Sequence, residues 1–143
     1  MKLVHDPSET EDFKFSVEPF SAAGKAAVDA IRNWQVLTDL VTFARERHGY
    51  GNSDGYFGIT YPGDLDDCDR VNGESISEGN VEAYAWYGAT DGDTHILSEL
   101  EYLTLLRQYF SVCRQEDLAA SIARLQTEIA EQGVPAKTDR AGG

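Results

Sequence analysis

The side chains most able to do chemistry in this chain are carboxylates, and four of them lie in one short run. Asp64, Asp66, Asp67 and Asp69 fall within six positions. Hard cations such as Ca²⁺ take oxygen ligands from clustered carboxylates. An EF-hand loop needs glycine at its sixth position and glutamate at its twelfth, but counting from Asp64 these positions hold Asp69 and Ser75. The run therefore indicates a metal site only weakly, and a solvated acidic loop or a surface for a basic protein explains it better.

Acid–base and nucleophilic chemistry finds little support elsewhere in the sequence. The three histidines, His5, His48 and His95, are far apart along the chain, and a structural role explains each of them. The sequence has no phosphate-binding loop, and Cys68 and Cys113 do not have the spacing of a zinc site. We therefore expect no enzymatic activity, no metal and no cofactor, and both cysteines as unpaired thiols.

The charge of the chain is concentrated in its middle third. The 143 residues carry 12 Lys and Arg against 25 Asp and Glu, a net charge of -13. Residues 54–101 hold 12 of the acids and a single base, Arg70, a net charge of -11. This charge disfavours nucleic acid and anionic membranes as partners and favours a basic protein. Since the N-terminus resembles neither a signal peptide nor a membrane span, we expect the chain in the cytoplasm.

Aromatic residues share this acidic third. Among them are the tyrosines and the tryptophan Tyr56, Tyr61, Tyr84, Trp86 and Tyr87. Tyrosine and tryptophan are enriched in the cores of protein interfaces, so the combination favours a binding surface with an acidic rim. Aromatic residues of strands also fill hydrophobic cores, and the alternation over 81–87 leaves open which face of that strand is buried.

The elements that must position these residues follow from hydrophobic periodicity and from capping residues. Alternation predicts strands over 13–17, 56–61 and 81–87, and the turn residues 90–93 predict a hairpin whose second arm is 94–97. Ser21 is a potential cap for a helical region that runs from Ala22 to Ala44, with a break near 33–35. Ser98 and Glu101 form a capping box for another helix, and a last helix starts near Glu116 and ends at Gly133 and Pro135.

The domain organisation follows from this order of elements. We expect a loose N-terminus over 1–12, one α+β domain over 13–135 with a small, mostly antiparallel sheet packed by helices, and a disordered tail over 136–143. The chain is long enough to bury a core of its own, and no linker divides it.

The order of elements and one motif resemble a known family. The motif is Pro-x-Asp-Leu-Asp-Asp after an aromatic strand, here Pro62, Asp64, Leu65, Asp66 and Asp67. Before it come a short strand, a helical segment and a glycine-rich stretch; after it come a hairpin and the helix opened by Ile96-Leu97-Ser98-Glu99. Over residues 13–115 the chain is similar to the immunity proteins that protect bacteria from the ribonuclease toxins of contact-dependent growth inhibition systems.

The resemblance implies a non-catalytic inhibitor that binds a toxin domain in the cytoplasm. On this interpretation the toxin-binding surface consists of Asp64, Asp66, Asp67, Asp69, Glu74, Glu78, Glu82, Tyr84, Trp86, Asp91 and Asp93. An acidic surface can imitate the phosphates that a ribonuclease binds and can steer association. Two alternatives stay open: a divalent-metal-binding protein or metal-dependent enzyme that uses Asp64 to Asp69, and an acidic adaptor or chaperone for another basic protein.

Overall fold

A four-stranded antiparallel sheet and the helices on one of its sides form the body of the computed structural model, which describes residues 1–52, 56–65, 76–86 and 93–142. The strands of this sheet are β3 (Tyr50–Gly51), β4 (Phe57–Thr60), β5 (Asn80–Ala85) and β6 (His95–Ser98), in that spatial order. A separate hairpin pairs β1 (Lys2–His5) with β2 (Phe15–Glu18). The helices are α1 (Glu11–Lys14), α2 (Ala22–Asn33), α3 (Leu37–Glu46), α5 (Glu99–Val112) and α6 (Glu116–Gly142), with a short 3₁₀ turn, η1 (Pro62–Asp64). The predicted α+β class with a small antiparallel sheet is confirmed.

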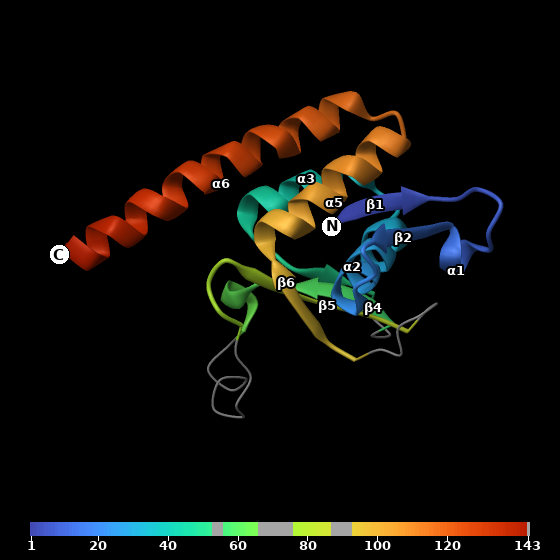
Figure 1. The fold of residues 1–143 in the computed structure, drawn as a ribbon, viewed down its shortest axis with the longest axis horizontal. Helices are drawn as coiled ribbons and strands as arrows, with labels where there is room; N and C mark the ends of the chain where they lie inside the picture. Colours follow the sequence, from blue (N-terminus) through green and yellow to red (C-terminus); the bar gives the residue numbers. More distant parts are fainter. Residues whose placement is uncertain (53–55, 66–75, 87–92, 143) are drawn as a thin grey trace.

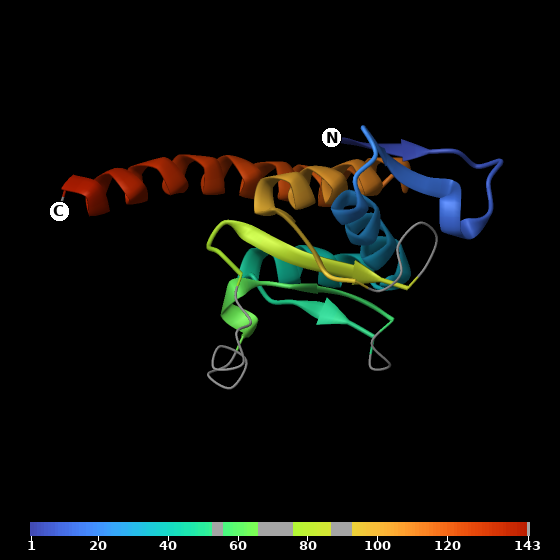
Figure 2. The ribbon, with the colours of Figure 1, turned by 60° about the horizontal axis from the view of Figure 1, so that its bottom comes forward.

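The helices gather on one side of the four-stranded sheet (Figures 1 and 2). Helix α2 packs against β4, β5 and β6, and α5 packs against α2 and α6. The alanines of α2 explain its close fit, because Ala26, Ala27 and Ala30 are fully buried and leave room for the sheet beneath them. Ser21 caps this helix as predicted, its Oγ accepting a hydrogen bond from the Gly24 amide at 3.1 Å.

The register of β5 answers the question of which strand face is buried. Val81, Ala83 and Ala85 are fully buried under the helices, whereas the alternate residues point away from them. Strand β5 pairs Gly58 with Tyr84 on one side and Glu82 with Ile96 on the other. The predicted hairpin of β5 and β6 is confirmed, although the residues of its turn, 87–92, lie outside the described part of the chain.

Helix boundaries agree with several capping predictions. The break near 33–35 separates α2 from α3, and Arg47 ends α3 in the left-handed conformation at φ 53°. Ser98 opens α5, its Oγ accepting from the Glu101 amide at 3.0 Å. Leu103, Leu106 and Phe110 of this helix are fully buried, as their shared face predicts.

Two predictions about the chain ends are wrong. Residues 2–5 are not loose, because they form β1, and the Leu3 amide donates to Oε1 of Gln108 on α5 at 2.7 Å. Helix α6 does not end at Gly133 and Pro135; it continues to Gly142, so residues 136–142 are helical. Glycine and proline disfavour a helix without forbidding it, because the fixed φ of proline, about −65°, is itself helical.

Candidate protein-binding surface

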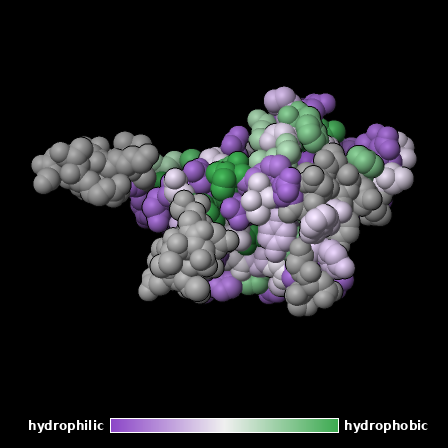
Figure 3. Space-filling model, turned by 90° about the horizontal axis from the view of Figure 1, so that it is seen from below, coloured by the Kyte–Doolittle hydropathy of each residue, from purple (hydrophilic) through white to green (hydrophobic). Residues whose placement is uncertain are grey.

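The side of the four-stranded sheet that faces away from the helices carries exposed aromatic and aliphatic residues. No described helix covers this side (Figure 2). Figure 3 shows it from below, with residues of intermediate hydropathy gathered between the grey segments. We call it the open sheet face, and strand alternation assigns to it Gly51, Tyr56, Gly58, Thr60, Glu82, Tyr84, Trp86 and Ile96.

Three large side chains of the open sheet face are about half exposed. Trp86 is 58% exposed, Tyr56 49% and Ile96 48%. Trp86 and Tyr56 are neighbours on adjacent chain segments, since the Trp86 amide donates to the Tyr56 carbonyl at 2.9 Å. A single exposed apolar residue needs no explanation, but aromatic residues grouped on one rigid surface are typical of binding sites.

Two glycines, Gly51 and Gly58, make room for the ring of Tyr84 on the open sheet face. A Cβ atom added to Gly58 would lie 2.7 Å from Tyr84 Oη, and one added to Gly51 would lie 3.3 Å from the same atom. The ring therefore covers bare backbone of β3 and β4, which leaves it half-buried while the outer side remains accessible. A tyrosine fixed in this way loses little conformational entropy when a partner binds.

Glu82 introduces a carboxylate into the open sheet face. It lies across from Thr60 on β4 and Ile96 on β6. Partial burial among these neighbours raises the pKa of the Glu82 carboxyl above its usual range. A cationic group of a partner placed here would gain from a partly desolvated negative charge.

The remaining predicted site residues fall into three groups. Asp93 is exposed just before β6, and Glu78 is exposed in the turn before β5. Asp64 is exposed, but its Oδ2 accepts hydrogen bonds from the Gly49 amide at 2.8 Å and the Tyr61 amide at 2.7 Å, so it holds η1 against the end of α3. The residues that lie outside the described part of the chain are Asp66, Asp67, Asp69, Glu74 and Asp91.

The structure thus brings Glu82, Tyr84 and Trp86 together on the open sheet face. It places Asp64 and Glu78 elsewhere, on the wall of a pocket beside η1. The residues of the open sheet face that the sequence did not assign to the site are Gly51, Tyr56, Gly58, Thr60 and Ile96. The signal for the glycines lies in the register, because both stand on the face that Tyr84 covers, and register is visible only after strands are paired.

Two of the histidines, His5 and His48, contact neighbouring groups of the fold. The His5 ring stacks on Phe15 at 4.6 Å between centroids, and His48 Nδ1 lies 2.6 Å from the Gly49 carbonyl oxygen. Cys113 carries an unpaired thiol, whereas Cys68 lies outside the described residues. Within residues 1–52, 56–65, 76–86 and 93–142, no group of three His, Cys, Asp or Glu side chains is arranged to hold a metal ion.

Residues 51–55, Gly-Asn-Ser-Asp-Gly, match the Gly-x-Ser-x-Gly spacing of a nucleophile elbow. An elbow needs a strand before it and a helix after it, whereas this segment connects β3 to the antiparallel strand β4. The pattern therefore lacks the context that would make its serine, Ser53, a nucleophile; Ser53 itself lies outside the described residues.

Comparisons with known proteins add no assignment. No protein-family model, no curated protein and no solved structure gives a significant match to the chain. Among the helices that the structure describes, none has the length and apolar character needed to cross a membrane. The function must therefore be argued from the surface itself.

Proposed function

We propose that this protein is a cytoplasmic immunity protein that binds and neutralises a basic ribonuclease toxin domain. The observation that carries the proposal is the open sheet face, on which half-exposed Trp86 and Tyr56 lie side by side next to the glycine-supported Tyr84. Large aromatic side chains on a rigid surface are the usual anchors of protein interfaces. The resemblance of the Pro62 to Asp67 motif to immunity proteins supports the same role.

The charge of the chain supports a basic partner. A net charge of -11 over residues 54–101 creates a negative potential around the strands that build the open sheet face. A ribonuclease needs a positively charged groove for its phosphate substrate, so the two surfaces are complementary. Long-range attraction speeds association, while the aromatic anchors provide specificity.

The test is co-expression with the toxin domain encoded directly upstream of this chain. We expect a complex that survives size-exclusion chromatography and growth that is restored when both chains are present. An unrelated basic protein of similar charge is the control, and it should neither co-elute nor compete. Absence of the complex would contradict the proposal, and equal binding of the unrelated protein would favour an acidic adaptor instead.

A further inference from the structure

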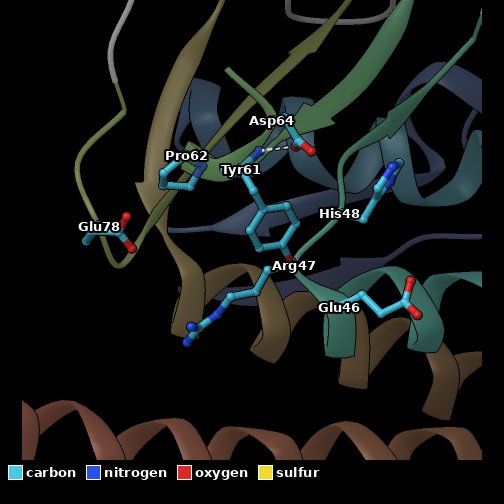
Figure 4. A pocket seen from close by; sticks show the side chains of 8 residues that line it. Glu46, Arg47, His48, Tyr61, Pro62, Asp64 and Glu78 are labelled. Atoms are coloured by element: carbon cyan, nitrogen blue, oxygen red, sulfur yellow. Dashed lines mark hydrogen bonds between the residues drawn. The ribbon is translucent and has the colours of Figure 1, made fainter. Parts of the chain in front are cut away.

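A pocket of about 400 Å³ lies beside the open sheet face, where the end of α3 meets η1 and the turn before β5. Figure 4 shows side chains from these three segments arranged around it. The residues that line it are Glu46, Arg47, His48, Tyr61, Pro62, Gly63, Asp64 and Glu78. Charged side chains therefore share its lining with Tyr61, Pro62 and Gly63.

Tyr61 brings a polar atom without a partner to this pocket. The residue is only 2% exposed, and its Oη makes no hydrogen bond in the structure. Figure 4 shows its ring among the lining side chains, with the hydroxyl end beside Arg47. A buried hydroxyl without a partner is unfavourable, so a ligand that supplies a hydrogen-bonding group here would gain affinity.

The charges around Tyr61 determine which kind of ligand fits. Glu46, Asp64 and Glu78 are the acidic residues of the lining, and the Asp64 carboxylate already accepts hydrogen bonds from the Gly49 and Tyr61 amides. The positive charge of Arg47 is already engaged, because its Nε donates to Oε2 of the buried Glu99 at 2.9 Å, and this bond raises the pKa of the guanidinium. The carboxyl end of α3 adds the negative end of a helix dipole. The pocket therefore favours a cation over an anion.

We propose that this pocket receives a lysine or arginine side chain of the basic partner, whose cationic group binds between Glu78 and Tyr61 Oη. Lysine and arginine carry only hydrogen-bond donors, which suits both the carboxylate and the unpartnered phenol oxygen. Access to Tyr61 Oη requires the Arg47 side chain, which is 53% exposed, to shift while its Nε keeps the ion pair with the buried Glu99. The inference rests on the proposed function, and it names the chemical group that the partner must present.

The test uses small cations, so that it does not depend on the toxin. The protein is titrated with n-butylguanidinium chloride and n-butylammonium chloride at constant ionic strength, and amide shifts are followed by NMR. We expect saturable shifts at Gly49, Gly63 and Glu78, and none from n-butanol or sodium butyrate. Glu78→Gln and Tyr61→Phe should each weaken binding by roughly threefold to fivefold. Glu9→Gln, the same charge change on the exposed N-terminal turn, should leave it unchanged.

The outcomes separate this inference from the proposed function. Tyr61→Phe removes an atom without a hydrogen bond, so the variant should fold and remain informative. Shifts that do not saturate, equal shifts with butyrate, or wild-type affinity in Tyr61→Phe would each overturn the inference. If the toxin domain binds tightly while the small cations do not, the pocket assignment fails and the proposed function stands. If the cations bind and the toxin domain does not, the proposed function fails.

Discussion

The ring of Tyr84 lies directly over the backbone of its cross-strand partner Gly58. A Cβ atom at position 58 would lie 2.7 Å from Tyr84 Oη and 2.8 Å from two ring carbons. Gly58 is itself buried beneath this ring. Gly58 is thus required for the close approach of the Tyr84 ring to β4, and it thereby fixes the position of this ring on the open sheet face.

Gly58→Ala should therefore displace the ring of Tyr84. We expect a loss of about 1–3 kcal/mol in the free energy of unfolding, because the added methyl group forces the ring away from β4. Urea denaturation measures this change. Gly63→Ala is the control, since a Cβ atom there has no heavy atom within 4 Å and should change stability by less than about 0.5 kcal/mol. Equal stability of the two variants would contradict the placement of Tyr84.

Trp86→Ala tests the aromatic anchor. Because Trp86 is 58% exposed, its removal should leave the free energy of unfolding nearly unchanged but should weaken toxin binding by about 2 kcal/mol or more. The loss should appear as faster dissociation in surface plasmon resonance. Phe20→Ala is the matched control, because Phe20 is 59% exposed and follows β2, outside the four-stranded sheet. If the two variants bind alike, the open sheet face is not the interface.

Glu82→Gln should give a pH-dependent gain in stability. The folded protein holds the pKa of Glu82 above its ordinary value of 4.5, so it favours the protonated carboxyl. The ionised form is therefore destabilising, and wild-type stability should rise as the pH falls through the raised pKa. The variant cannot ionise, so it should be the more stable protein at pH 7, and the difference should close as the pH falls below 4.5.

Urea denaturation at pH 7 and pH 4 measures this difference. Glu9→Gln, in the exposed N-terminal turn, is the control and should show no comparable gain at pH 7. A stability difference for Glu82→Gln that stays constant between the two pH values would show that its carboxyl is not desolvated. Binding of the proposed toxin domain by Glu82→Gln should weaken even though folding improves, because this protein loses a negative charge that attracts the basic partner.

Local signals predicted most elements of this fold, because helix capping and the alternation of apolar and polar residues in strands depend on residues that are close together in the sequence. Ser21 and Ser98 cap the helices that they were expected to cap. What the sequence could not show depends on pairing. Strand β1 is stabilised by β2 and by Gln108, more than a hundred positions away. The buried face of β5 likewise depends on the helices that pack on it.

Buried charges were a second limit of sequence reasoning. Lys25 and Asp29 look like ordinary polar residues of a helix, yet both are fully buried and their charged groups lie 2.7 Å apart. Burial raises the pKa of the Asp29 carboxyl, and one of its oxygens, Oδ2, has no hydrogen bond. Only part of the candidate site could be predicted from the sequence. Strand periodicity placed Glu82, Tyr84 and Trp86 on one face, whereas the pocket around Tyr61 joins segments that are distant in sequence.

Asp64 should behave differently from the other acids of its run. Asp64→Ala removes the acceptor for the amides of Gly49 and Tyr61, and we expect a loss of about 1–3 kcal/mol in the free energy of unfolding. Thermal and urea denaturation measure this loss. The control is Glu9→Ala, at an exposed acidic residue of the N-terminal turn. A loss no larger than that of the control would show that the two hydrogen bonds contribute nothing.

The charges of Asp66, Asp67 and Asp69 should act on the rate of association. These residues lie outside the described part of the chain, and the prediction rests on their charge in the sequence. The triple change to asparagine should preserve stability and slow association with the toxin domain at low salt, because long-range attraction is reduced. The rates should converge with wild type at high salt, since the Debye length is already only about 8 Å at physiological ionic strength. Stopped-flow measurements across a salt series test this prediction. If the triple variant associates at low salt as fast as the wild type, these three acids do not contribute to docking.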